Sequence, residues 1–194
     1  DGSILCGSST EHQGWRVHFE VTKDLGKTWQ VIGPIHEATK FNAIQPSILS
    51  YGEGTLQILC RTRESVIGQA WSKDNGKTWS EVTATELPNP SAGTDAVTLA
   101  DGRQLLVYKH TTREIAFPRR RQIIKVAVRT DGKAWHAALV LERDRNEFSY
   151  PAVIQTSDGK VHITYTWKRQ SVKHVVVDVD KLKLMPIEDG KWPQ

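Results

Sequence analysis

Polar side chains that could take part in chemistry open three similar segments of the chain. Gln45 opens QPSIL, Asp95 opens DAVTL and Tyr150 opens YPAVI. A phenol or a carboxylate can act as a nucleophile or a base, whereas an amide can only donate and accept hydrogen bonds. These three residues are therefore the first candidates for catalytic positions.

A second group of candidates has the side chains that bind anions and sugars. Arg61, Arg63 and Glu64 follow the apolar run LQILC, Arg121 ends a basic run, and Trp15 lies in a polar segment near the start. Planar guanidinium groups bind carboxylates through two parallel hydrogen bonds. An indole can stack on a sugar ring. The combination indicates substrate binding by a cup for an anionic ligand.

Short strands must position these residues. Each of the three opening segments is followed by a glycine turn and then by a second run, TLQILCRT, RQLLVYKH or KVHITYTW. Third runs follow, IGQAWS, IIKVAV and VKHVVVD. Runs rich in branched and aromatic residues between glycine turns are typical of hairpin strands, and helical periodicity is missing almost everywhere. We predict an all-β chain.

The strands recur with a period of about fifty residues, which is the length of a four-stranded propeller blade. We therefore predict a β-propeller of four-stranded antiparallel blades, with nearly four blades in one partial domain covering residues 1–194. The first blade lacks its opening strand. The expected blade units are approximately 1–35, 42–86, 93–141 and 148–188.

A repeated turn motif marks the junction between the third and fourth strands. It reads TKDLGKTW at 22–29, SKDNGKTWS at 72–80 and, one residue shorter, RTDGKAW at 129–135. An aspartate accepts hydrogen bonds from turn amides, a glycine supplies positive φ, and we expect the tryptophan to pack against its own blade. One carboxylate per turn is too few oxygens for calcium. We interpret these boxes as structural fasteners.

Blade geometry decides which candidates can meet. In an up-and-down blade the start of strand one and the end of strand two share a face, and the boxes lie on the other. Gln45, Asp95 and Tyr150 should then crowd the propeller axis beside Arg61. The alternative is that these residues merely satisfy strand ends around a wet channel.

Composition narrows the function further. Of 194 residues, 38% are hydrophobic and 25% charged, as in ordinary globular domains, and the net charge is +4. No nucleic-acid-binding motif accompanies this charge, so we expect no nucleic-acid partner. No apolar run approaches the length of a membrane span. Cys6 and Cys60 end short apolar runs, and buried free thiols are favoured over a disulfide. We predict no metal and no cofactor.

On these motifs the chain resembles the sialidase (neuraminidase) group of the BNR, or Asp-box, repeat superfamily. The segment SYPAVIQTSDGKVHITY at 149–165 is similar to the sialidase segment whose tyrosine is the nucleophile, which implies that role for Tyr150. Arg61 and Arg121 fall where the family has two of its three carboxylate-binding arginines. The resemblance implies an exo-acting glycosidase, a carbohydrate partner with an acidic sugar, and a secreted or periplasmic location.

A tyrosine nucleophile suits sialic acid, because the sugar's own carboxylate would repel an anionic nucleophile. A free phenol titrates near pH 10, so its ionisation at neutral pH costs roughly 4 kcal/mol without help from a base and nearby cations. In the family a glutamate supplies that help, and the matching position here is Gln45, which cannot accept a proton. Asp95 and Glu147 are alternative bases.

Two departures from the family leave alternatives open. The family fold has six blades, and its first arginine and its acid/base aspartate belong to early blades that residues 1–10 do not resemble. We expect a C-terminal portion of a longer protein, in preference to self-association through open strand edges or to a decayed relative. A non-catalytic carbohydrate-binding propeller and a protein-interaction scaffold remain as alternative functions.

Overall fold

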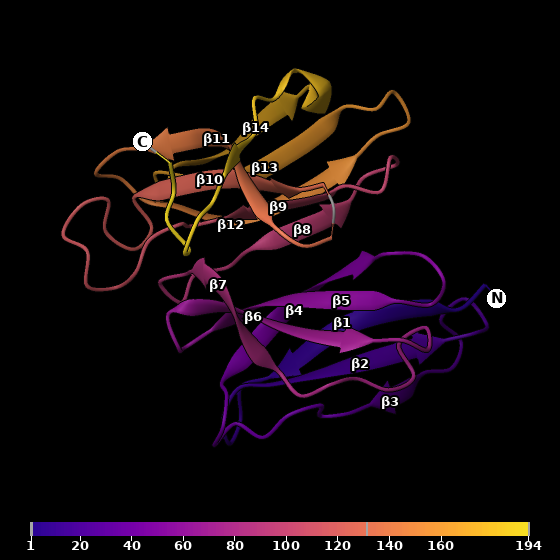
Figure 1. The fold of residues 1–194 in the computed structure, drawn as a ribbon. Coiled ribbons are helices and arrows are strands. Elements are labelled where there is room, and N and C mark those ends of the chain that lie inside the picture. Colours follow the sequence, from indigo (N-terminus) through magenta and orange to yellow (C-terminus); the bar gives the residue numbers. More distant parts are fainter. Residues whose placement is uncertain (1, 131, 194) are drawn as a thin grey trace.

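The computed structural model describes residues 2–130 and 132–193, and the chain is all-β in these ranges, as predicted (Figure 1). Asp1 of the predicted first turn and Asp131 of the third box lie outside the described residues. The helical structure in the described ranges is one 3₁₀ turn, η1 (Val179–Lys181). Within them, no helix has the length and hydrophobicity needed to cross a membrane.

The strands of the described residues form four antiparallel sheets that follow one another along the chain. Sheet 1 holds β1 (Ile4–Thr10), β2 (Arg16–Thr22) and β3 (Gln30–Ile32); sheet 2 holds β4 (Ala43–Ser50), β5 (Leu56–Thr62), β6 (Val66–Ser72) and β7 (Thr83–Pro88); sheet 3 holds β8 (Asp95–Thr98), β9 (Gln104–Tyr108), β10 (Ile123–Arg129), β11 (Trp135–Arg143) and β15 (Met185–Pro186); sheet 4 holds β12 (Phe148–Gln155), β13 (Val161–Trp167) and β14 (Ser171–Val177).

The number of strands per sheet differs from the four that the repeat predicts. Residues 185–186 form β15, which pairs with His136 and Ala137 of β11 in place of extending sheet 4. Among the described residues sheet 3 therefore has five strands, and sheet 4 has three. An open strand edge presents unpaired amides and carbonyls, which explains why a nearby segment can complete it.

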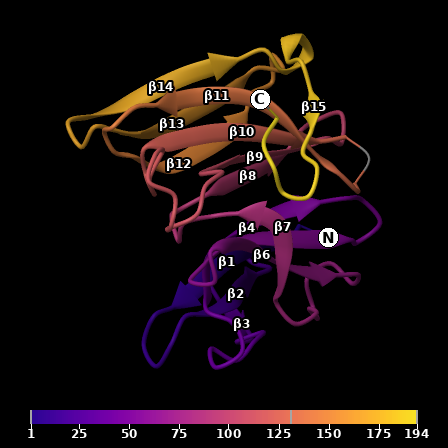
Figure 2. The ribbon, with the colours of Figure 1, turned by 60° about the vertical axis from the view of Figure 1, so that its left-hand side comes forward.

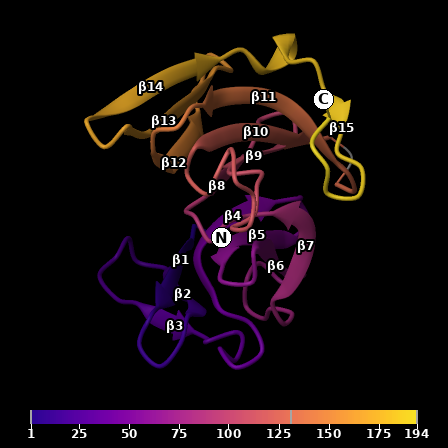
Figure 3. The same ribbon diagram turned by 90° about the vertical axis from the view of Figure 1, so that its left-hand side faces the viewer.

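The sheets are arranged in an arc, with β4, β8 and β12 on its inner side (Figures 2 and 3). Asp95 of β8 ties these three strands together. Its Oδ1 accepts a hydrogen bond of 2.8 Å from Ser47 Oγ on β4, and its Oδ2 accepts one of 2.8 Å from Val153 N on β12. Ala96 N also donates to Oδ1 at 2.9 Å. The inner strands of sheets 2, 3 and 4 therefore share one anchor.

Three apolar clusters fill the spaces between neighbouring sheets. One joins sheets 1 and 2 around Phe19 and Ile58, the next joins sheets 2 and 3 around Leu59 and Leu106, and the last joins sheets 3 and 4. Full burial of one such side chain stabilises the fold by roughly 1.5 to 3 kcal/mol. Because sheet 3 is covered on both faces, β10 is buried along its whole length, which accounts for the continuous apolar run IIKVAV.

Both cysteines are free thiols. Cys60 is fully buried in the cluster between sheets 1 and 2, and burial raises its pKa far above the ordinary value. Cys6 is partly buried on β1.

The first two boxes have the predicted turn chemistry. Asp74 Oδ1 accepts from Thr78 N at 2.9 Å, and Trp79 Nε1 donates to the carbonyl of Gly76 at 3.0 Å. The box at 22–29 repeats these bonds. The expected packing of the tryptophan needs correction: Trp79 stacks at 4.3 Å on Phe19 of β2, so it joins sheet 2 to sheet 1.

Candidate functional site

Two of the predicted site residues occupy equivalent irregularities in two inner strands. Gln45 on β4 and Tyr150 on β12 each precede a proline, and each lies where the pairing register shifts. Their φ angles are +57° and +50°, in the left-handed region that non-glycine residues seldom adopt. A bulge removes residues from the ladder and redirects their side chains, often beside functional sites. The same type of bulge, followed by a proline, therefore sets the direction of both side chains.

The side chains of Gln45 and Tyr150 converge on Gly93, just before β8. A Cβ atom at Gly93 would lie 3.1 Å from Tyr150 Cδ1 and 3.6 Å from Gln45 Oε1. Gly93 is buried, so the ring and the amide share a space that only a glycine leaves open. Gln45 and Tyr150 therefore both lie close to Gly93.

Arg61 and Arg121 both face Tyr150, whose side chain is 52% exposed. Both guanidinium groups lie close enough to Tyr150 to interact with it electrostatically, and Arg121 Cζ is 5.4 Å from the centroid of the ring. Burial is the main effect that lowers the pKa of Arg61, and the nearby positive charge of Arg121 lowers it too. Two cations from different sheets therefore point at one phenol.

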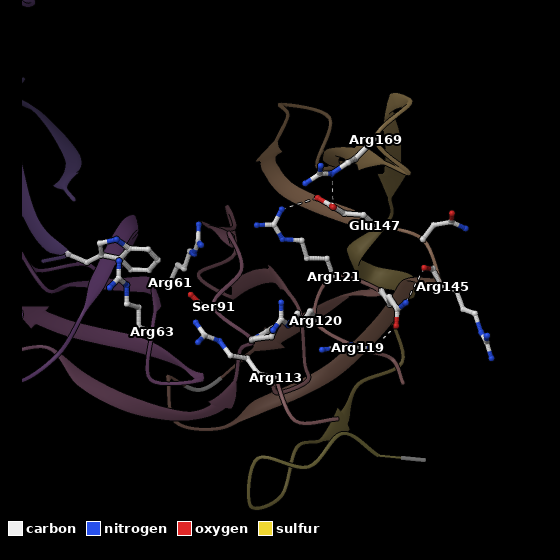
Figure 4. Close-up of a pocket in the computed structure, with 14 residues that line it drawn as sticks. Arg61, Arg63, Ser91, Arg113, Arg119, Arg120, Arg121, Arg145, Glu147 and Arg169 are labelled. Carbon is white, nitrogen blue, oxygen red and sulfur yellow. Dashed lines mark hydrogen bonds and ion pairs between the residues drawn. The ribbon is translucent and has the colours of Figure 1, made fainter. Parts of the chain in front are cut away.

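Glu147 holds Arg121 in place from the residues just before β12. Its Oε1 accepts hydrogen bonds of 2.9 Å from Arg121 Nη1 and 2.9 Å from Ser149 Oγ, and its Oε2 accepts one of 2.7 Å from Arg169 Nε (Figure 4). Burial raises the pKa of Glu147, but these three donors outweigh it and hold the pKa below the ordinary value. Glu147 is therefore an ionised carboxylate with both oxygens occupied.

The remaining predicted residues lie in three places. Trp15 is 6% exposed and lies between the guanidinium groups of Arg61 and Arg63, at 4.8 and 4.3 Å from its ring centroid. Glu64 accepts from Asn42 N at 3.0 Å and faces a separate, more outward cavity. Asp95, the anchor of the inner strands, lines a third cavity against β12. The Trp15 ring is therefore a surface on which two arginines stack, while Glu64 and Asp95 make structural hydrogen bonds.

An open cavity of about 770 Å³ is lined by Arg61, Arg121 and Glu147 together with other residues (Figure 4). Its charged lining consists of eight arginines and one glutamate: Arg61, Arg63, Arg113, Arg119, Arg120, Arg121, Arg145, Arg169 and Glu147. The sequence analysis named Arg61, Arg63 and Arg121 among these arginines but not the other five. Three of those five, Arg113, Arg119 and Arg120, lie in the long loop between β9 and β10, and that shared position is the signal that could have indicated them.

Lys109 is a buried cation that the sequence did not single out. Its side chain is fully buried at the end of β9, and its Nζ has no hydrogen-bond partner among the described residues. Burial lowers the pKa of Lys109 to about 7, helped by the positive charges of Arg121 and Arg61 and opposed by Glu147. In the described ranges, no group of acidic, histidine or cysteine residues is arranged to hold a metal ion.

Antiparallel sheets in an arc with Asp-box turns define an Asp-box repeat protein. The chain belongs to the BNR repeat-like domain family, whose model matches residues 1–163. This finding confirms the superfamily that the motifs indicate. No curated protein sequence matches the chain.

Solved structures give the same fold. The chain is similar to the K499G mutant of NanB sialidase from Streptococcus pneumoniae, with a TM-score of 0.72 and 17% identity over 94% of this chain and 30% of that one. It is also similar to the intramolecular trans-sialidase from Ruminococcus gnavus in complex with oseltamivir carboxylate (0.74, 19%, 95% and 42%). The Trypanosoma rangeli sialidase in complex with sialic acid gives 0.68 and 18%, over 93% and 30%. The chain therefore spans less than half the length of each of these proteins.

Proposed function

We propose that the chain forms part of a sialidase-like glycoside hydrolase that removes a terminal acidic sugar, sialic acid by family likeness, with Tyr150 as the nucleophile. One observation carries the proposal: Tyr150 lies close to the guanidinium groups of both Arg61 and Arg121, with Arg121 Cζ 5.4 Å from the centroid of its ring. Anionic carbohydrate is the partner that this arrangement suits.

The chemistry follows from the charges around the phenol. Arg61 and Arg121 bind the carboxylate of the sugar through charge-assisted hydrogen bonds. The Tyr150 oxygen forms a bond to the anomeric carbon as the bond to the leaving oxygen breaks. The phenolic proton passes to a carboxylate, for which Asp95 and Glu147 are the candidates, and the leaving oxygen takes a proton from the acid/base aspartate that the family has in an early blade. The two cations stabilise the negative charge that the phenol oxygen carries as it loses that proton. Glu147 keeps Arg121 oriented, and the bulge at Tyr150 directs the hydroxyl outward.

We further propose that the four sheets are blades of one β-propeller domain, with units near 1–35, 42–86, 93–141 and 148–188, of which residues 185–186 complete the third blade in place of the fourth. The shared anchor of β4, β8 and β12 supports a common axis, because Asp95 bonds to strands on both sides. Tyr150 and Arg61 then lie on the site face, and the boxes lie at the opposite ends of the strands, as the pairing of Leu56 with Ser72 indicates.

A second candidate is a propeller that binds the same sugar without turnover. Gln45 favours it, because this amide lies beside Gly93 together with Tyr150 at the position where the family has a carboxylate, and an amide cannot accept the phenolic proton.

A fluorogenic sialoside tests the two candidates. Turnover that is abolished in Tyr150→Phe and weakened in Arg61→Ala supports catalysis. Binding of sialic acid that survives Tyr150→Phe but fails in Arg61→Ala, with no turnover in any variant, supports the binding protein. If neither arginine affects affinity or turnover, the proposal is wrong.

A further inference from the structure

The arginine-lined cavity contains far more positive charge than one sugar carboxylate can neutralise. Eight arginines line it and one carboxylate, Glu147, opposes them, although the whole chain carries a net charge of only +4. Like charges held together repel one another and cost stability unless a ligand or solvent compensates them. The excess is therefore concentrated at one place.

Half of these arginines are not used by the site already described. Arg61 and Arg121 face Tyr150, Arg169 pairs with Glu147, and Arg63 stacks on Trp15. The other four arginines make no ion pair within the described residues. They are Arg113, Arg119, Arg120 and Arg145.

Three of the four come from one loop, the connection between β9 and β10. Arg113, Arg119 and Arg120 are solvent-exposed and line the same cavity as Arg61 and Arg121. In Figure 4, Arg113 points toward Ser91 and Arg61. We call these three residues the loop arginines.

Two further observations indicate that the charge faces a ligand and is more than a solvated surface. The backbone of Arg120 is in the left-handed region, at a φ of +50°, and such strained positions cluster at binding sites. Near the lining residues Arg121, Arg61 and Glu147, Lys109 is a fully buried amine with no hydrogen-bond partner among the described residues. An ordinary solvated surface needs neither feature.

We propose that the natural ligand is an acidic glycan with at least two anionic groups, the second of which lies on the sugar next to the terminal one and is bound by the loop arginines. This inference rests on the proposed function, in which Arg61 and Arg121 take the terminal carboxylate. A guanidinium group matches a carboxylate and a sulfate ester equally well. The cavity of about 770 Å³ is in the range for ligands larger than one sugar ring.

Three sialosides of matched size test the inference: one with a neutral second sugar, one with a second sialic acid, and one with a sulfate ester on the second sugar. Affinity and kcat/KM are measured for each at low and high salt. We expect at least one dianionic ligand to bind about tenfold more tightly than the monoanionic sialoside with the neutral second sugar, as one added charged hydrogen bond provides. The advantage should shrink as salt rises. Which arm gains identifies the second group as carboxylate or sulfate.

The triple variant Arg113→Gln, Arg119→Gln and Arg120→Gln should bind the dianionic and the monoanionic sialosides with nearly equal affinity, so that the ratio of the two affinities is close to one. A matched variant, Lys23→Gln, Lys27→Gln and Lys77→Gln, removes the same charge from exposed positions in the boxes and should keep the ratio. Equal affinity for all three ligands with turnover retained overturns this inference and leaves the proposed function standing. A preference that survives the triple arginine variant also overturns it, and no binding or turnover of any sialoside overturns both proposals.

Discussion

The Tyr150 ring and the Gln45 amide lie against the same buried glycine, Gly93, although they belong to two inner strands with a third between them. A Cβ at Gly93 would be 3.1 Å from the ring and 3.6 Å from the amide oxygen. Both residues sit in proline-containing bulges with positive φ. The position of the phenol therefore depends on the absence of a side chain at Gly93 and on the bulge that β4 and β12 share.

Gly93→Ala should reduce turnover without unfolding the protein. The added methyl is closer to Tyr150 Cδ1 than ordinary van der Waals contact, so the ring must shift. We expect kcat/KM to fall by about tenfold or more, since small misplacements of reacting groups are costly, while the free energy of unfolding changes by about 1 kcal/mol or less. Steady-state kinetics and urea unfolding measure both quantities.

In a Tyr150→Phe background the same alanine should have no further effect on turnover. If Gly93→Ala alone leaves kcat/KM undiminished, the absence of a side chain at Gly93 does not control the position of Tyr150.

Gln45→Glu should raise turnover. A carboxylate at this position would face Tyr150 and accept its proton, and a well-placed general base contributes about 10²- to 10⁴-fold. The gain requires the ionised form of the new carboxylate, so it should disappear as pH falls through the pKa of that group. Rates measured from pH 4 to 8 test this, with Gln45→Met as the control of similar size. No gain in kcat at any pH contradicts the prediction.

Lys109→Met should stabilise the fold at neutral and acidic pH. The folded pKa is about 7 and the ordinary value is 10.5, so the charged amine carries its full burial penalty below pH 7, and the penalty is relieved as pH rises from 7 to 10.5. Below pH 7 the variant should gain roughly 3 to 5 kcal/mol at most. The gain should shrink steadily between pH 7 and 10.5.

Urea unfolding at pH 6 to 10 measures this difference between Lys109→Met and the wild type. Lys109→Arg is the control, because a guanidinium cannot lose its proton and should destabilise the fold at every pH. A difference that does not vary with pH shows that the amine is not held neutral.

Asp74→Asn should lower stability more than Asp24→Asn does. Hydrogen bonds from Thr78 and Thr28 lower the pKa of each aspartate to about 2. The stabilisation is complete above the ordinary value near 3.8 and is lost as pH falls from there to about 2.

The two boxes differ in the tryptophan that they orient. Trp79 stacks on Phe19 between sheets 1 and 2, whereas Trp29 is 49% exposed. Thermal melts at pH 3 and 6 should show both variants less stable than the wild type at pH 6, with smaller differences at pH 3. Equal losses in the two variants contradict the role assigned to Trp79.

Local patterns in the sequence were enough to predict the strands, the turns and the likeness to sialidases. The Asp-box hydrogen bonds join residues four apart, and the alternation of branched residues sets the strands, so both depend on near neighbours. That Tyr150, Gln45 and Arg61 meet at one site stays a prediction, made because each opens or ends a strand in a repeated unit.

The packing of one sheet on the next decided the rest. The arginine-lined cavity draws side chains from β5 and from connections between strands spread from Trp15 to Arg169. The burial of Lys109 depends on what covers β9, and the strand β15 joins sheet 3 because an edge is open there. These features arise from contacts between residues far apart in the chain. No periodicity or short motif encodes such distances, so only the tertiary structure brings them together.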